Sequence, residues 1–173
     1  MRYAICNETF VDWPLERACA AAAEAGYSGL EVAPFTLGSR PAALSAGERA
    51  RIADTIRAAG LECIGLHWLL ARTEGLHVTS PDAAARRAAV EHLGALAALC
   101  RDLGGRVMVF GSPQQRSLVA GTTPQEALDR LRGVFTELVP ALEDTGTVVA
   151  LEPLAPSETD VLNTAAVTRE VIA

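Results

Sequence analysis

The chain has 173 residues, of which 50% are hydrophobic and 21% are charged, and this balance suits one well-buried soluble domain rather than a disordered segment. Its formal net charge is −6, and no run of Lys and Arg offers a surface for phosphates, so nucleic acid is not expected as a partner. No segment approaches the roughly 18 consecutive apolar residues of a membrane span, and the first residues are typical of a strand rather than of a signal peptide. We therefore expect a single cytoplasmic domain over residues 1–173, with no membrane partner.

A sequence pattern recurs along the chain: a helical stretch, then a glycine, then a short apolar run. It appears as AAAEAGYSGLEVAP, TIRAAGLECIGLH, LCRDLGGRVMVFG and LEDTGTVVALEP. The glycine of each copy stands where a helix ends in a left-handed residue, a conformation that glycine adopts without a Cβ penalty. These glycines are Gly26, Gly60, Gly104 and Gly146. Each copy predicts a helix-to-strand turn, so the chain consists of repeated βα units.

Five apolar runs are predicted as strands, near residues 2–6, 29–33, 61–66, 106–110 and 147–151. Val, Ile and Leu dominate them with little polar alternation, which is typical of a parallel sheet covered on both faces. The fold class is therefore α/β.

Helix starts agree with this pattern. Ser80-Pro81-Asp82 and Thr123-Pro124 each offer a hydroxyl N-cap followed by proline at the first helical position. A last helix is expected to run to about residue 173, capped by one of two neighbouring residues, Thr159 or Asp160.

Five βα units fall short of a closed (β/α)₈ barrel, which takes eight units and about 250 residues. Two explanations remain: a complete, open, doubly wound sheet, or a barrel sequence truncated after its fifth unit. The first strand has no GxGxxG turn, and no other strand end supplies a glycine loop that cradles phosphate. This favours the truncated barrel.

A polar residue closes each apolar run. In parallel α/β folds the chemistry gathers beyond the carboxyl ends of the strands, so these residues are expected to converge on one rim. They are Asn7-Glu8, Glu31, His67-Trp68, Ser112 and Glu152.

Glu152 is the strongest of these candidates for binding a divalent metal. Pro153 follows it and prevents a regular helix from continuing through it. A buried carboxylate needs a partner, which a divalent cation at a barrel mouth supplies. A neighbouring Arg or a helix N-terminus is the alternative partner.

Other candidates have both a functional and a structural interpretation. Glu31 either points to the rim or pairs with a buried Arg. His67 either contacts a substrate hydroxyl, ligates metal or packs in a hydrogen-bonded site. Trp13, Trp68 and Phe35 follow strands, where aromatic rings either stack on a sugar or pack within loops.

The remaining cysteines and histidines are not expected to be catalytic. The four cysteines form no CxxC pair and are predicted to be buried, reduced thiols. They are Cys6, Cys19, Cys63 and Cys100. His77 and His92 are expected to be exposed to solvent.

Five segments together resemble a known family: ICNETF, GYSGLEVAPFTLG, GLHWLL, VMVFGSPQQR and ALEPLAPSETDVLNTA. They are similar to the xylose-isomerase-like sugar phosphate isomerases and epimerases, which include the ketose 3-epimerases. The resemblance implies a (β/α)₈ TIM barrel of which about five βα units are present. It also implies an enzyme of carbohydrate metabolism whose remaining metal ligands come from strands six to eight.

By this resemblance Glu152 binds a divalent ion, Mn²⁺, Mg²⁺ or Co²⁺, and also acts as the acid–base group, while Glu158 contacts the substrate. The other strand-end side chains are expected to contact the sugar or sugar phosphate; these are Asn7, Glu31, His67, Trp68 and Ser112. The expected reaction is isomerisation or epimerisation of a ketose by proton abstraction next to the carbonyl, through an enediolate.

Several alternatives remain open. A keto-inositol dehydratase or a hydroxypyruvate isomerase would use the same fold and metal chemistry. A catalytically incomplete fragment or sugar-binding module is the non-enzymatic alternative, and the acidic charge and three histidines disfavour an apurinic endonuclease. An open half-barrel leaves its first and fifth strands unpaired, so a homodimer is expected.

Overall fold

The computed structural model describes residues 1–10 and 12–172 and contains a five-stranded parallel sheet. Its strands are β1 (Ala4–Cys6), β2 (Gly29–Val32), β3 (Glu62–Leu66), β4 (Val107–Phe110) and β5 (Val148–Leu151). Each strand lies within two residues of its predicted bounds, and every neighbouring pair is parallel. The predicted parallel α/β sheet is therefore confirmed.

The strands lie side by side in chain order, β1-β2-β3-β4-β5. A doubly wound sheet reverses its strand order at a switch point, and this sheet has no reversal. Right-handed crossovers between successive neighbours keep the connecting helices on one side of the sheet, as in a barrel. The order therefore excludes the doubly wound alternative within the described chain.

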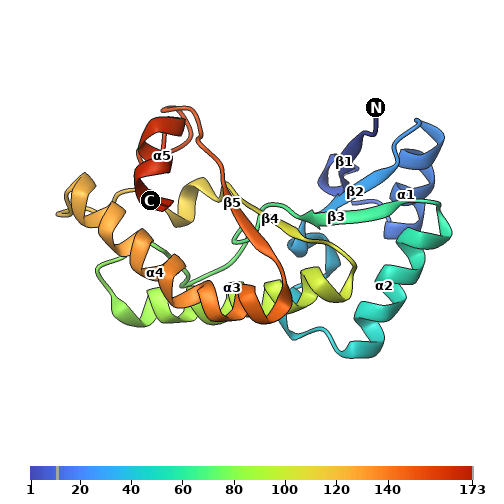
Figure 1. The fold of residues 1–173 in the computed structure, drawn as a ribbon, viewed down its shortest axis with the longest axis horizontal. Coiled ribbons are helices and arrows are strands. Elements are labelled where there is room, and N and C mark those ends of the chain that lie inside the picture. The colour runs from blue at the N-terminus through green and yellow to red at the C-terminus, as the bar shows by residue number, and fades with distance from the viewer. Residues whose placement is uncertain (11, 173) are drawn as a thin grey trace.

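Five α-helices accompany the strands: α1 (Leu15–Glu24), α2 (Ala46–Ala58), α3 (Ala83–Asp102), α4 (Pro124–Thr145) and α5 (Ala165–Ile172). Figure 1 shows α2, α3 and α4 along one side of the sheet, with α5 near the C-terminus. Short 3₁₀ helices lie in the loops, at Asn7–Thr9, Pro34–Leu37, Pro41–Ala43 and Pro113–Gln115. No helix of the described residues is both long and apolar enough to cross a membrane.

Side chains of the strands alternate between a buried face and a half-open face. Met108 and Phe110 of β4 are fully buried, and the Phe110 ring meets Phe135 of α4 edge-on at 5.1 Å. Val107 and Val109 point the other way and are only half-buried, and Val148 of β5 is 54% exposed. The prediction of a sheet covered on both faces is wrong, because apolar runs supply side chains to both faces whether or not a second layer is present.

Four of the five helices, α1 to α4, end at the glycines that the sequence pattern predicts. One of them, α4, also begins at its predicted N-cap. Gly26, Gly60, Gly104 and Gly146 have positive φ angles of 88°, 76°, 88° and 65°. Thr123 caps α4 in a reciprocal capping box with Glu126, and these predictions are confirmed.

Two predicted helix starts are wrong. The N-cap of α3 is Asp82, whose carboxylate accepts from the Ala84 N–H at 2.8 Å, because its side chain reaches the first turn and Ser80 lies two residues too early. The last helix begins at Ala165, after residues 159–164 have formed a loop.

In that loop Asp160 accepts instead from the Leu118 N–H at 2.7 Å, and Thr159 accepts from the Val161 N–H at 3.4 Å. Neither side chain is therefore available as a cap. The predicted helix end at residue 173 lies outside the described residues.

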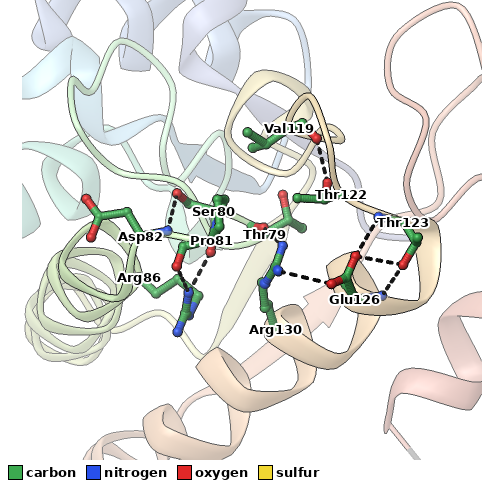
Figure 2. A network of polar contacts seen from close by, with 10 residues as sticks. All are labelled: Thr79, Ser80, Pro81, Asp82, Arg86, Val119, Thr122, Thr123, Glu126 and Arg130. Atoms are coloured by element: carbon green, nitrogen blue, oxygen red, sulfur yellow. Dashed lines mark hydrogen bonds and ion pairs between the residues drawn. The ribbon is translucent and has the colours of Figure 1, made fainter.

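A polar network links the start of α3 to the start of α4 (Figure 2). Arg130 of α4 donates to the Thr79 carbonyl at 3.4 Å and lies 3.7 Å from the Glu126 carboxylate. Arg86 of α3 donates to the Ser80 carbonyl at 2.6 Å. Because both helices start at the carboxyl ends of strands, this network holds together loops on the rim side of the sheet.

Candidate active and metal-binding site

The strand register brings side chains from three neighbouring strands onto one face of the sheet. Cys6 of β1 pairs with Glu31 of β2, and Glu31 pairs with Gly65 of β3. Side chains alternate along a strand, so His67, two residues beyond Gly65, lies on the same face. This face is opposite to the helix-covered core.

His67 lies between two carboxylates. Its Nδ1 is 3.3 Å from Glu31 Oε2, and its Nε2 is 3.6 Å from Glu152 Oε2. The side chains of His67, Glu31 and Glu152 are 24%, 30% and 37% exposed. The structure therefore brings these three of the predicted site residues together on a rim that solvent reaches.

Cys6 belongs to the same cluster, and the sequence reasoning missed it. Its thiol, a Glu31 carboxylate oxygen and a His67 ring nitrogen all lie within 4.8 Å of one another. Cys19, Cys63 and Cys100 are buried and free as predicted, whereas Cys6 is only half-buried. The prediction of burial is wrong for Cys6, because it ends its strand on the open face.

The charge state of His67 follows from these neighbours. The Cys6 thiol first, and then the Glu31 carboxylate, raise the pKa of His67 to about 10 against the opposing effect of burial. Without a bound ion, the imidazole is therefore a cation at neutral pH. Its Nδ1 is nevertheless shielded from solvent and forms no hydrogen bond of good geometry, since the 3.3 Å contact with Glu31 is close but poorly aligned.

Gly111 leaves the space that the Glu152 carboxylate occupies. Gly111 follows β4, and a Cβ on it would lie 2.6 Å from Glu152 Oε2. The absence of a side chain at Gly111 therefore lets the carboxylate lie over the β4 backbone next to His67.

Arg116 holds the backbone at Glu152 and was also missed. It is fully buried, and its Nη1 donates to the Glu152 carbonyl at 2.8 Å and to the Phe110 carbonyl at 3.4 Å. Its Nε and Nη2 are buried without a hydrogen-bond partner. Burial lowers the pKa of Arg116, while the charges of Glu152 and Glu158 act in the opposite direction.

From the sequence, a neighbouring Arg is one alternative to a metal ion as the partner of the Glu152 carboxylate. Arg116 contacts the backbone carbonyl of Glu152, and among the described ion pairs the Glu152 carboxylate faces His67. The VMVFGSPQQR segment gives no signal for the burial of Arg116, because an Arg in a loop after a strand ordinarily reaches solvent.

Asn7 and Ser112, two predicted substrate contacts, form hydrogen bonds with neighbouring loops. The Asn7 side chain accepts from the Ala33 N–H and donates to Thr36 Oγ1, both at 2.8 Å. Ser112 Oγ accepts from the Leu70 N–H at 3.1 Å. Both residues are buried, so these polar groups tie loops together.

Glu158 forms a hydrogen bond within its own turn. It is exposed, and its Oε2 accepts from the Ala155 N–H at 3.1 Å. The structure brings it near Arg116, whose pKa its charge affects.

Trp68 and Phe35 line a hollow of about 310 Å³ together with Glu8, Ser112 and Gln114. The Trp68 ring lies 6.1 Å from the His67 ring, so this hollow adjoins the cluster. A larger hollow of about 880 Å³ contains none of the strand-end residues, and the smaller one is the better candidate for a substrate. Trp13 packs against Phe10 and under Arg17, in agreement with loop packing.

His77 and His92 are half-buried, so the prediction that both are exposed is wrong. His77 Nδ1 lies 3.2 Å from Thr79 Oγ1, in a loop folded back on the protein. Nε2 of His92 is buried without a hydrogen-bond partner, and burial lowers the pKa of both residues.

The fold and the rim cluster define a barrel protein with its polar groups at the carboxyl ends of parallel strands. A family model described as xylose isomerase-like TIM barrel matches residues 19–173. The chain therefore belongs to the xylose isomerase-like TIM barrel family. A search of curated protein sequences gives no match.

Solved structures agree with this fold. L-ribulose 3-epimerase has a TM-score of 0.81 and 24% identity, covering 99% of this chain and 56% of its own. The 3-keto-D-glucoside 4-epimerase of E. coli has a TM-score of 0.80 and 17% identity, covering 99% and 63%.

The D-psicose 3-epimerase of Clostridium cellulolyticum H10, crystallised with D-tagatose, has a TM-score of 0.80 and 16% identity, covering 99% and 59%. The chain thus spans less than two thirds of the length of these proteins. It has the fold of a partial (β/α)₈ barrel with five βα units.

Proposed function

We propose that this chain carries part of the active-site rim of a metal-dependent isomerase or epimerase that acts on a ketose sugar or sugar phosphate. The observation that carries the proposal is the position of Glu152. It follows β5 at the carboxyl edge of the sheet, with its carboxylate beside His67 and in the space left by Gly111. Several proteins of similar fold are ketose 3-epimerases, which supports the reaction class.

Glu152 fits the role of one oxygen ligand for Mn²⁺, Mg²⁺ or Co²⁺. Its side chain is 37% exposed at the rim, and hard divalent cations prefer carboxylate oxygens. By the family resemblance, further ligands come from strands six to eight. The bound ion would stabilise the negative charge that develops on the substrate oxygens.

Glu152 performs the first proton transfer in this proposal. The Glu152 carboxylate takes a proton from the carbon next to the ketose carbonyl, which leaves a cis-enediolate. Epimerisation then needs a proton returned to the opposite face of that carbon by a second carboxylate. His67, whose Nε2 lies 3.6 Å from Glu152 Oε2, donates hydrogen bonds within the site, and Glu158 contacts the hydroxyl and carbonyl end of the sugar.

The hollow lined by Trp68 and Phe35 would hold the apolar face of the sugar ring. A keto-inositol or hydroxypyruvate substrate would use the same proton abstraction, so substrate screening separates these alternatives. The proposal also includes a homodimer and a cytoplasmic location. Four free cysteines suit a reducing compartment.

Solvent deuterium exchange tests the proposal directly. The chain is incubated in D₂O with Mn²⁺ and a panel of ketoses, including D-fructose, D-tagatose, D-psicose and L-ribulose, with and without phosphate. NMR then follows deuterium at the carbon next to the carbonyl. This readout detects proton abstraction even where the return to the other face is missing.

We expect Glu152→Gln to slow this exchange by about 10²–10⁴-fold, the range attributed to a positioned acid–base group. Glu137→Gln, on the exposed side of α4, is the matched control and keeps the full rate. Exchange that persists in Glu152→Gln, or no exchange with any ketose, would contradict the proposal.

A further inference from the structure

Three metal-binding side chains of different chemistry meet at the carboxyl ends of three adjacent strands. Cys6 offers a sulfur, Glu31 an oxygen and His67 a nitrogen, all within 4.8 Å of one another. The strand register fixes this arrangement, because Cys6 and Glu31 are paired residues and His67 follows the strand next to them. The cluster is therefore built by the sheet, and not by a loop.

The spacing suits a small cation with tetrahedral coordination. Bonds of about 2.0–2.3 Å from zinc to nitrogen, oxygen and sulfur place neighbouring ligand atoms roughly 3.3–3.8 Å apart. The distance from His67 Nδ1 to Glu31 Oε2 is 3.3 Å, which matches one edge of such a tetrahedron. The Cys6 sulfur lies within 4.8 Å of both other ligand atoms.

The nitrogen that would bind the ion has no other partner of good geometry. His67 Nδ1 is shielded from solvent and lacks a hydrogen bond, although Glu31 lies at 3.3 Å. A buried polar atom left without a partner is destabilising. A cation held between Nδ1 and the Glu31 carboxylate would satisfy both groups.

The other ring nitrogen of His67, Nε2, faces a carboxylate, as is common in histidines that bind a metal ion. A histidine that binds metal through one nitrogen commonly directs the other toward a carboxylate, which fixes the ring orientation. His67 Nε2 faces Glu152 Oε2 at 3.6 Å. An ion on Nδ1 would therefore lie on the side of the ring away from Glu152.

We propose that Cys6, Glu31 and His67 form a zinc site on the open face of the sheet, distinct from the ion assigned to Glu152. One sulfur, one nitrogen and one oxygen favour Zn²⁺ over Mg²⁺ or Ca²⁺, which select oxygen ligands. Three protein ligands leave one coordination position for water or substrate. The site shares no ligand with the ion assigned to Glu152; His67 would bind zinc through Nδ1 and still direct Nε2 toward Glu152, and the two proposals are tested by different readouts.

Cobalt titration tests the site with a readout that does not depend on catalysis. The chain is treated with chelator under reducing conditions and titrated with Co²⁺, whose thiolate complexes absorb in the near ultraviolet. We expect one equivalent of Co²⁺ to produce this absorption and Zn²⁺ to displace it, with Mg²⁺ having no effect.

The variants identify the ligands. Cys6→Ser is expected to abolish the thiolate absorption, and His67→Gln and Glu31→Gln to weaken Zn²⁺ binding by more than about 100-fold, beyond the 10–100-fold attributed to groups that only orient a ligand. Cys19→Ala, which removes a buried thiol of α1, is the matched control and keeps the absorption. Glu152→Gln removes the carboxylate that faces Nε2 but no ligand, so it keeps the absorption at saturating Co²⁺ and weakens binding by at most about 10–100-fold.

Three results would overturn the zinc site: no thiolate absorption in the unaltered chain, absorption that survives Cys6→Ser, or absorption lost in Glu152→Gln. The first would leave His67 as a cation paired with Glu31. The last would make Glu152 part of a single site.

Discussion

The carboxylate of Glu152 occupies the space that a side chain on Gly111 would take, since a Cβ there would lie 2.6 Å from Glu152 Oε2. Gly111 is not in the left-handed region, so its role is to leave room. The position of the candidate metal ligand therefore depends on a residue of the neighbouring strand's end.

Gly111→Ala is expected to impair activity more than stability. The atom it meets is the end of a flexible side chain, which moves away at little cost, and a shift of about 1 Å at a reacting group lowers a rate by roughly 100-fold. Deuterium exchange and thermal unfolding measure the two effects. Gly47→Ala is the control, because a Cβ at Gly47 meets nothing within 4 Å. Equal losses of rate and stability at Gly111 would contradict this role.

Arg116→Met is expected to lower the free energy of unfolding by about 1–3 kcal/mol, because it leaves the part-buried carbonyl of Glu152 without its donor. Urea denaturation measures the change. The control is Arg57→Met, which removes an exposed ion pair with Asp54 and is expected to change stability by less than about 1 kcal/mol. A neutral Arg116→Met would show that the buried guanidinium does not hold the end of β5.

Stability is expected to fall as the solution becomes acidic, and His92 is one cause. Burial lowers the pKa of His92, so the unfolded chain binds a proton more readily than the folded chain. The stabilising contribution is fully present above the unfolded pKa of about 6.5 and is lost as the pH falls through and below it.

His92→Gln is therefore expected to flatten the loss of stability between about pH 7.5 and pH 5 relative to the unaltered chain. Urea denaturation at both pH values measures this difference. His77 contributes in the same direction, so the double variant is flatter still. His67 acts in the opposite direction, because its pKa is raised to about 10: its contribution to stability is fully present below the unfolded pKa of about 6.5 and is lost as the pH rises from there through about 10.

The half-open sheet is expected to associate. Val148 is 54% exposed and Tyr3 is 58% exposed, and they lie in or next to the two edge strands. Light scattering is expected to show a dimer, which Val148→Arg weakens by placing a charge on the open face. Thr136→Ala, on the exposed side of α4, is the control. A monomer at all protein concentrations would contradict the expected homodimer.

The sequence predicts the sheet well because the signals that mark the ends of helices and strands are local. A glycine such as Gly104 marks the helix end, and the apolar run after it marks the strand. The polar residue at each strand end is equally visible, which is how Glu31, His67 and Glu152 were found together.

The remaining site residues depend on register, which the sequence does not show. Cys6 looks like a core thiol until its pairing with Glu31 places it on the open face. Gly111 looks like a loop glycine, and Arg116 like a surface residue, until the end of β5 lies against them. For Asn7 and Ser112, polarity at a strand end does not reveal that a backbone group already uses the side chain, and their substrate contacts stay predictions.

Asn7 also determines how the N-terminal edge of the sheet comes apart. β1 has only three residues and pairs with β2 alone in the described chain. The Asn7 side chain forms hydrogen bonds with Ala33 and Thr36 beyond the end of β2, and these bonds attach the short strand β1 to its neighbour. When they break, β1 frays and Cys6 moves away from Glu31 and His67. Amide hydrogen exchange in residues 4–6 is therefore expected to report how often the donor cluster is dismantled while the rest of the sheet stays folded.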